Sequence, residues 1–212
     1  MENKFVINIG RQIGSGGKSV GEALARRLGV KLYDKELINL AAKQSGLCPE
    51  VFEQADEKRS HNRLATLLGY LRAPFMSDGG TTDVLSGDAL FKIQSDVIRN
   101  IAARESALFV GRCAYYILRD HPCRISLFLT ADDDDRVTRI CERTGCSEAE
   151  ARQTMERGDA HRAAYYNYYS MRTWGAAASY DLCMNTSLLG IEGTAELILQ
   201  LATQKLDLTS DL

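Results

Sequence analysis

The chain has 212 residues, of which 45% are hydrophobic and 25% are charged, and its formal net charge is −2. This balance is typical of one globular domain, and it argues against a general binder of nucleic-acid polymers or membrane surfaces. No apolar run approaches the roughly 20 residues that span a bilayer, and the N-terminal stretch lacks a signal-peptide pattern, so we expect a cytoplasmic protein.

The first predicted elements are a strand, a glycine-rich turn and a helix. An apolar run rich in β-branched residues, at residues 5–9, predicts a buried strand. Four glycines, a lysine and a serine follow it: Gly10, Gly14, Gly16, Gly17, Lys18 and Ser19. Glycines at this density predict backbone N–H groups that approach an anion, and the N-terminus of the next helix favours phosphate.

The motif matches the standard phosphate loop only in part. Lys18 would supply a positive charge to terminal phosphates, and the Ser19 hydroxyl would lie where Mg²⁺ binds. However, the pattern G-x-x-x-x-G-K-[ST] has glycine at position 12, where this chain has Gln12. The strand–loop–helix context favours a phosphate site, and the alternative is a glycine-rich turn without a ligand.

The next predicted elements are a strand at residues 30–33, which ends at Asp34, and a helix over residues 37–42. Together with the first strand they form a βαβ unit, which predicts a parallel sheet. Residues 46–87 interrupt this alternation, with predicted helices near 49–55 and 64–71 and a mobile loop at 77–88. We interpret this block as an insert over the carboxyl edge of the sheet; the alternative is a surface helix with a linker.

The alternation resumes at Asp88, which we expect to cap a helix. Further strands are predicted at residues 107–110, 124–130 and 180–185, with helices at 88–101, at 114–119 and from 191 onward. The predicted fold is therefore α/β, a three-layer αβα arrangement around a five-stranded parallel sheet, in a single domain over residues 1–212.

Two charged helices are predicted between the last two strands. The acidic run 132–135 cannot all face one metal ion, so we interpret it as the start of a helix. Ser147 and Glu150 predict a capping box for the next helix. Arginines recur on one face of the first helix, at Arg136, Arg139 and Arg143. Residues 136–172 are either solvated, salt-bridged helices or an arginine-bearing lid that closes over phosphates. The aromatic residues within 165–174 predict lid or core packing rather than a base-stacking platform.

Six segments of the chain, in order, resemble the cytidylate-kinase-like branch of the nucleoside monophosphate kinases. They are GRQIGSGGKSVGEALARRLGVKLYDKELI (10–38), FKIQSDVI (91–98), VGRCAYYILRD (110–120), RVTRICERTG (136–145), DAHRAAYYNYY (159–169) and YDLCMNTSLLGIE (180–192). The GRQ-x-GSGGK stretch is the most specific of them. The resemblance implies a P-loop kinase with a helical acceptor-binding insert and a helical lid, which transfers the γ-phosphoryl group of ATP to CMP or dCMP.

The resemblance also implies roles for individual residues, with ATP and Mg²⁺ at the glycine-rich loop and Ser19 on the metal. The implied contacts to the ATP phosphates are Gly14, Ser15, Gly16, Gly17, Lys18, Ser19 and Arg136. The implied catalytic residues are Lys18, Arg112, Arg139 and Arg143. The implied contacts to the acceptor nucleotide are Asp34, Lys35, Arg112, Asp159 and Arg162.

The chain departs from the family pattern in three places. Cytidylate kinases have aspartate after the strand-end arginine, where this chain has Cys113, and a thiol accepts poorly from an exocyclic amine. The family also has a Tyr-Arg pair after the strand-two aspartate, where this chain has a stretch with Lys35 and Lys43. Finally, Gln12 alters the glycine spacing of the phosphate loop. Two alternatives therefore stay open beside a CMP kinase: a P-loop kinase for another small acceptor, and a nucleotide-binding protein without transfer. The oligomeric state is open too, a homodimer included.

Overall fold

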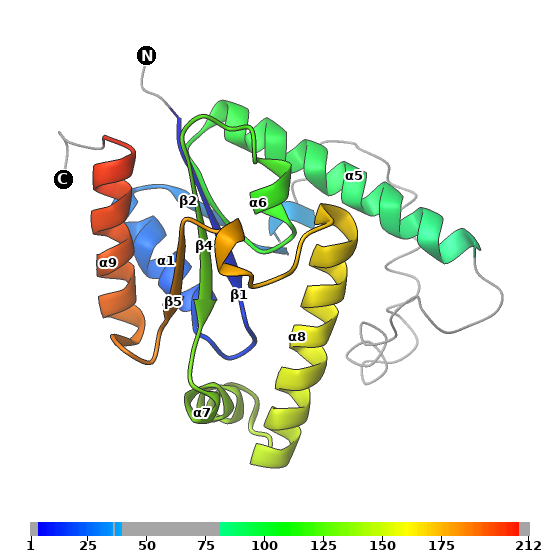
Figure 1. Cartoon of the computed structure of the whole chain (residues 1–212), viewed down its shortest axis with the longest axis vertical. Helices are drawn as coiled ribbons and strands as arrows, with labels where there is room; N and C mark the ends of the chain where they lie inside the picture. Colours follow the sequence, from blue (N-terminus) through cyan, green and yellow to red (C-terminus); the bar gives the residue numbers. More distant parts are fainter. Residues whose placement is uncertain (1–3, 36, 40–80, 208–212) are drawn as a thin grey trace.

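The structure is a computed structural model that describes residues 4–35, 37–39 and 81–207. Its centre is a sheet of five strands in the order β2-β3-β1-β4-β5 (Figure 1). The strands are β1 (Val6–Arg11), β2 (Lys31–Tyr33), β3 (Ala107–Val110), β4 (Arg124–Thr130) and β5 (Leu182–Asn185). Every pairing is parallel, so the carboxyl ends of the strands meet at one edge of the sheet.

Helices cover both faces of this sheet (Figure 1). They are α1 (Gly17–Leu28), α5 (Thr81–Arg104), α6 (Ala114–Ile117), α7 (Asp133–Thr144), α8 (Glu148–Ser170), the 3₁₀ helix η1 (Ala177–Ser179) and α9 (Gly190–Lys205). Helices α1 and α9 lie on one face, whereas α5, α6 and α8 lie on the other. Among the helices of the described ranges, none is both long enough and apolar enough to cross a bilayer.

The two-residue period of β1 divides the core between the two faces. Ile7 and Ile9 pack in the cluster that includes Leu24 of α1, whereas Val6 packs in the cluster that includes Ile98 of α5. Both strand faces are thus buried, which explains the continuous apolar run in the sequence. The predicted three-layer αβα fold with a parallel sheet is confirmed.

The predicted boundaries hold for most elements but not for the loop at residues 77–88. Within its described part, α5 already begins at Thr81, so Asp88 lies inside a helix and does not cap it. A helix that is nucleated and packed against the sheet adds one hydrogen bond per residue, which outweighs the roughly 1 kcal/mol cost of a single glycine. The helix predicted at 114–119 ends earlier, at Ile117.

Most of the predicted insert lies outside the described residues, including its two helices near 49–55 and 64–71. Of the helix predicted at 37–42, residues 37–39 are described and are helical.

The two charged helices begin as the sequence predicts. The capping box of α8 is present, with Ser147 and Glu150 bonding to each other's backbone N–H groups. Asp132 is the N-cap residue of α7, but its carboxylate accepts a hydrogen bond from Asn185 at 2.7 Å instead of capping the helix. No cluster of three or more metal-ligating side chains occurs in the part of the chain that is described. Asp133, Asp134 and Asp135 form the first turn of α7.

Candidate active site

The phosphate loop, residues 12–17, joins β1 to α1 at the carboxyl edge of the sheet. Gly14 and Gly16 have φ angles of 77° and 74°, in the left-handed region that favours glycine. A Cβ on Gly14 would also lie 2.7 Å from the carbonyl oxygen of Arg136, so a side chain there would clash. No side chain caps α1 within the described structure, which leaves the N–H groups of its first turn for an anion.

The unusual spacing of the motif does not distort this loop. Gln12 stands where the standard pattern has glycine, but its φ is not positive, so a side chain is tolerated there. Its backbone N–H donates to the carbonyl oxygen of Leu129 at 3.1 Å, and its own carbonyl accepts from the Ser15 hydroxyl at 2.9 Å. Gly10, which the sequence analysis grouped with the loop, belongs to β1 instead.

Lys18 and Asp34 connect the loop to the end of β2. The Lys18 Nζ atom lies 2.8 Å from the carboxylate of Asp34, which is buried and also accepts from the backbone N–H of Leu37 at 3.1 Å. The Ser19 side chain is exposed beside them, on the first turn of α1. The predicted phosphate-binding lysine and the strand-two aspartate therefore share one corner of the site.

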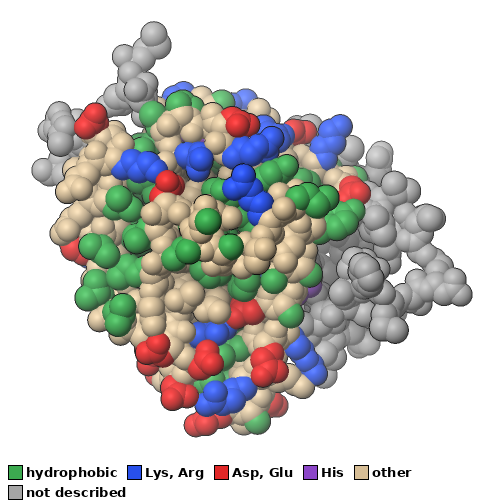
Figure 2. Space-filling view, viewed as in Figure 1, with side chains coloured by type: hydrophobic (Ala, Val, Ile, Leu, Met, Phe, Trp, Pro, Cys, Tyr) green, Lys and Arg blue, Asp and Glu red, His purple; other side chains and the backbone are tan. Residues whose placement is uncertain are grey.

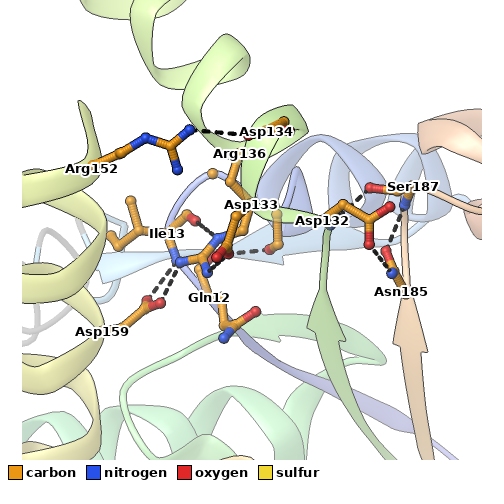
Figure 3. Close-up of polar contacts among 12 residues, drawn as sticks. Gln12, Ile13, Asp132, Asp133, Asp134, Arg136, Arg152, Asp159, Asn185 and Ser187 are labelled. Carbon is orange, nitrogen blue, oxygen red and sulfur yellow. Dashed lines mark hydrogen bonds and ion pairs between the residues drawn. The ribbon is translucent and has the colours of Figure 1, made fainter. Parts of the chain in front are cut away.

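Arg136 ties α7 and α8 to the phosphate loop (Figure 3). Its side chain is 6% exposed, its Nε donates to the carbonyl oxygen of Ile13 at 2.7 Å, and its Nη1 lies 3.1 Å from a carboxylate oxygen of Asp133. Its other terminal nitrogen pairs with Asp159, whose second oxygen accepts from the N–H of Ile13 at 2.7 Å. The carbonyl group and the N–H group of Ile13 thus bond to the two members of one ion pair, Arg136 and Asp159. No sequence pattern predicted this structural role for Arg136 and Asp159, and their expected contacts to nucleotides stay predictions.

Arg139 supports the same loop from the next turn of α7. Its Nη1 lies 3.3 Å from the carbonyl oxygen of Gly14 and 3.1 Å from the hydroxyl oxygen of Thr186. Buried Thr186 donates in turn to the carbonyl oxygen of Ser15 at 2.8 Å. By contrast, Arg143 is exposed on the last turn of α7.

The outer surface of α7 matches the other interpretation of this region, that of solvated, salt-bridged helices. Acidic and basic side chains lie side by side over α7, at the lower end of the molecule in Figure 2. One such exposed pair joins Arg152 to Asp134 at 3.0 Å. In the predicted lid, α7 therefore contacts the phosphate loop on one side and solvent on the other.

A cavity of about 290 Å³ lies beside the phosphate loop, at the carboxyl ends of β1 and β3. Its polar lining is basic and its walls are aromatic. The basic residues are Arg11, Lys35, Arg112, His161 and Arg162. The aromatic residues are Tyr115, Tyr165, Tyr166, Trp174 and Tyr180, and Asn8 and Gly10 of β1 also line the space. The structure thus brings together the predicted acceptor residues Lys35, Arg112 and Arg162.

Arg112 is held in the cavity by an unusual backbone. Gly111, Arg112 and Cys113 have successive φ angles of 81°, 57° and 56°, a run of left-handed residues that is strained for side chains other than glycine. The Arg112 Nε donates to the side-chain oxygen of Gln94 at 3.0 Å, and the guanidinium lies over the ring of Tyr165, 4.6 Å from its centroid. Strain of this kind concentrates at functional sites, which supports the predicted place of Arg112 in the site.

Arg11 lies between the loop and the cavity, and no sequence pattern predicted a role for it. A Cβ on Gly17 would be 2.7 Å from the Arg11 Cβ, and one on Gly111 would be 2.0 Å from the Arg11 Nη1. The side chain therefore runs from the phosphate loop to the end of β3. The GRQ motif contained Arg11, but only the packing of β1 against its neighbours shows where its side chain lies.

The three arginines of the cavity carry charge without a carboxylate at ion-pair distance among the described residues. Arg162 donates to the carbonyl oxygen of Arg11 at 2.8 Å, yet no described carboxylate lies within ion-pair distance of Arg11, Arg112 or Arg162. Burial, reinforced by the charges of Arg162 and Arg112, lowers the pKa of Arg11 to about 9, and burial likewise lowers the pKa of Arg162 to about 10. Both remain protonated at neutral pH, so the cavity is suited to an anion.

Two further groups of the cavity are neutral. Burial raises the pKa of the Cys113 thiol to about 12, so it cannot act as the carboxylate that cytidylate kinases have at this place. Burial and the positive charges of Lys35, Arg112 and Arg162 lower the pKa of His161.

The strand order, the three layers and the glycine-rich loop ahead of α1 define the P-loop kinase fold. The chain belongs to the cytidylate kinase-like family, whose sequence profile matches residues 6–188. It is 30% identical over 118 residues to a cytidylate kinase of Sulfolobus acidocaldarius, and the match covers 54% of this chain but only 62% of that protein.

Solved structures agree with this fold. An uncharacterized protein from Eubacterium ventriosum superposes with a TM-score of 0.71 at 28% identity, over 94% of this chain and 98% of the other. A shikimate kinase from Acinetobacter baumannii in complex with shikimate superposes with a TM-score of 0.51 at 14% identity, over 99% and 97% of the two chains. The second likeness concerns the fold alone.

Proposed function

We propose that this protein transfers the γ-phosphoryl group of ATP to a nucleoside monophosphate, with CMP and dCMP as the first candidates. The observation that carries the proposal is the placement of two anion sites side by side. One is the uncapped N-terminus of α1 with Lys18, and the other is the cavity with its three guanidinium groups. Arg11 spans the two, and membership of the cytidylate kinase-like family supports the same conclusion.

The donor side would hold the phosphates of ATP on the backbone N–H groups of residues 14–19, with Lys18 neutralising the terminal charge. Mg²⁺ prefers oxygen ligands, and the exposed hydroxyl of Ser19, with the carboxylate of Asp34 near Lys18, would supply them. When bound, the ion would neutralise phosphate charge. Arg136 and Arg139 contribute indirectly, because they hold the carbonyl groups of Ile13 and Gly14 and so keep the loop in shape.

The acceptor side would hold the monophosphate with Arg11, Arg112 and Arg162. An oxygen of the acceptor phosphate forms a bond to the γ-phosphorus while the bond to the β-bridging oxygen breaks, and ADP leaves. The attacking oxygen is already anionic, so no strong general base is required. Catalysis then consists of positioning and of neutralising the charge on the transferred group.

One observation favours a second candidate, a P-loop kinase for another small anionic acceptor. The neutral, buried thiol of Cys113 replaces the carboxylate with which cytidylate kinases read cytosine. The third possibility, a nucleotide-binding protein without transfer, predicts ATP binding without turnover on any acceptor.

A coupled ATP-consumption assay with Mg²⁺ across CMP, dCMP, UMP, AMP and GMP tests the proposal. We expect turnover with a pyrimidine monophosphate, and a loss of about 10²- to 10³-fold in kcat/KM for Lys18→Ala, because one preorganised cation is removed. Lys31→Ala is the matched control, since Lys31 pairs with Glu105 at the protein surface. Turnover of none of the five nucleotides, or an unchanged rate for Lys18→Ala, contradicts the proposal.

A further inference from the structure

Asn8 is a buried polar residue whose side chain lacks hydrogen bonds. It lies on the central strand β1, opposite Phe109 of β3 and Ser126 of β4, and is 2% exposed. Neither its carboxamide oxygen nor its carboxamide nitrogen has a hydrogen-bond partner within the described structure. A buried unpaired polar group costs about 1–3 kcal/mol, so native structures keep one where it has a purpose. Asn8 lines the same cavity as the three arginines.

Asn8 lines that cavity from β1, among closely packed aromatic rings. Residues of β1 alternate between faces, so Gly10 lies on the same face as Asn8. A Cβ on Gly10 would be 2.9 Å from a ring carbon of Phe128 and 3.4 Å from one of Tyr180, which shows how closely aromatic rings pack here. The hydroxyl of Tyr165, another lining residue, is also buried and unpartnered. This end of the cavity combines aromatic walls with unused polar atoms, as a planar heterocycle requires.

The arrangement of charge along β1 gives the ligand a direction. Arg11 ends the strand and Asn8 lies three residues earlier, so their Cα atoms are roughly 10 Å apart at the rise of a β-strand. An anion at the guanidinium groups would therefore point its other end inward, toward Asn8. A cavity of about 290 Å³ is at the small end of ligand pockets, which favours a pyrimidine over a purine.

Building on the proposed function, we infer that Asn8 is the specificity-determining residue that reads the base of the acceptor, and that it accepts cytosine and uracil alike. A carboxamide offers one donor and one acceptor. Cytosine presents an amine donor beside the N3 acceptor, and uracil presents the N3–H donor beside a carbonyl acceptor. A half-turn of the carboxamide exchanges its two groups, and no hydrogen bond to another described residue prevents this turn.

A carboxylate at the same place would read the bases differently, because it only accepts hydrogen bonds. Asn8→Asp should therefore favour cytosine, whose amine donates, over uracil, whose carbonyl it would repel. Asn8→Leu should weaken the binding of both CMP and UMP. The test is to measure Kd for CMP and UMP by calorimetry, together with kcat/KM for each, in the wild-type protein and both variants.

We expect the wild type to bind CMP and UMP within about 10-fold of each other, and Asn8→Asp to shift the ratio toward CMP by about 10-fold or more. Asn8→Leu should raise both Kd values by a similar factor. Arg11→Met is the control variant, because loss of a phosphate contact weakens both nucleotides equally and leaves their ratio unchanged. Thermal unfolding of each variant shows that it folds, and Asn8→Ser replaces Asn8→Leu if the latter does not.

The outcomes separate this inference from the proposed function. If CMP is turned over and the ratio of the Kd values for CMP and UMP is the same in wild type and Asn8→Asp, the role of Asn8 is overturned and the proposed kinase activity stands. This result is expected if Asn8 only binds buried water, because substitution would then change the melting temperature alone. If the ratio of the two Kd values shifts but neither nucleotide is turned over, the role of Asn8 in reading the base is supported and the proposed kinase activity is overturned. Binding of neither nucleotide overturns both.

Discussion

The molecule holds arginines in two groups near the phosphate loop, and the groups differ in their partners. The loop arginines, Arg136 and Arg139, bind backbone carbonyl groups of the loop and are paired with carboxylates of α7 and α8. The cavity arginines, Arg11, Arg112 and Arg162, have no carboxylate at ion-pair distance in the described ranges, and Asp34 and Asp159 attract Arg11 and Arg162 only from beyond that distance. A structural arginine here has a carboxylate at ion-pair distance, whereas an arginine available to a ligand has none. The spacing of arginines in the sequence does not make this distinction.

This difference has an energetic consequence. A buried arginine with its carboxylate is neutralised, so the removal of either partner leaves an uncompensated charge and destabilises the fold. Half-buried arginines without a carboxylate at ion-pair distance repel one another, and an anion relieves that repulsion when it binds. Substitutions in the two groups should therefore have opposite patterns: loss of stability in the first, and loss of binding without loss of stability in the second.

The largest expected effect is in the loop group. Arg136→Met leaves the carboxylate of Asp159 without its cation and frees the carbonyl group of Ile13. We expect the free energy of unfolding to fall by about 3–5 kcal/mol, as for other broken buried pairs. Urea denaturation monitored by circular dichroism measures it.

Arg152→Met is the matched control, because Arg152 forms an exposed ion pair with Asp134. Its loss should change the free energy of unfolding by only about 0–1 kcal/mol. Equal effects for the two variants would contradict the structural role of Arg136.

A smaller effect, of the opposite kind, is expected in the cavity group. The Arg11 side chain makes no hydrogen bond or ion pair with another residue of the described part, and it is repelled by Arg162 and Arg112. Arg11→Met should therefore not lower the free energy of unfolding, but should raise KM for the acceptor by about 10- to 100-fold, because a hydrogen bond to a charged group is lost. Steady-state kinetics with each substrate varied in turn measures this, and KM for ATP should change less.

Arg99→Met serves as its control, because Arg99 forms an exposed pair with Asp96 on α5. It should leave both KM values unchanged. An Arg11→Met protein that is less stable but has a normal acceptor KM would place Arg11 with the structural group.

The smallest expected effect concerns His161, whose pKa is lowered by burial and by the positive charges of the cavity. Its pKa is below the ordinary value of 6.5, so the unfolded chain takes up the proton first and stability falls as the pH drops through 6.5 toward the folded pKa. A bound dianion reverses this preference, so sulfate should bind about 3- to 10-fold more tightly at pH 5.5 than at pH 7.5. Calorimetric titration of sulfate at both values measures it.

His161→Gln should abolish that pH dependence, because sulfate itself does not titrate in this range. A dependence that survives in the variant would assign it to another group.

The sequence predicted the fold well, and it directed attention to the glycine-rich loop and to Arg112. Short apolar runs rich in β-branched residues predicted the strands, and helical spacing predicted the helices between them; the parallel sheet that the strands form is confirmed. The glycine-rich motif predicted an open helix N-terminus beside Lys18, and the resemblance placed Arg112 at the end of β3. The periodicity of α7 also predicted that Arg136 and Arg139 share a face, but it could not say what that face contacts.

The sequence by itself determined the order of the elements, the phosphate loop and the capping box of α8, because each depends on residues that are neighbours along the chain. Only the tertiary structure decided which arginines are neutralised and which cavity Asn8 lines. Arg136 meets Ile13 and Asp159 through the packing of α7 and α8 on the loop, and Asn8 meets the cavity through the register of β1. Such contacts join residues far apart in the chain, so no local pattern of residue types encodes them.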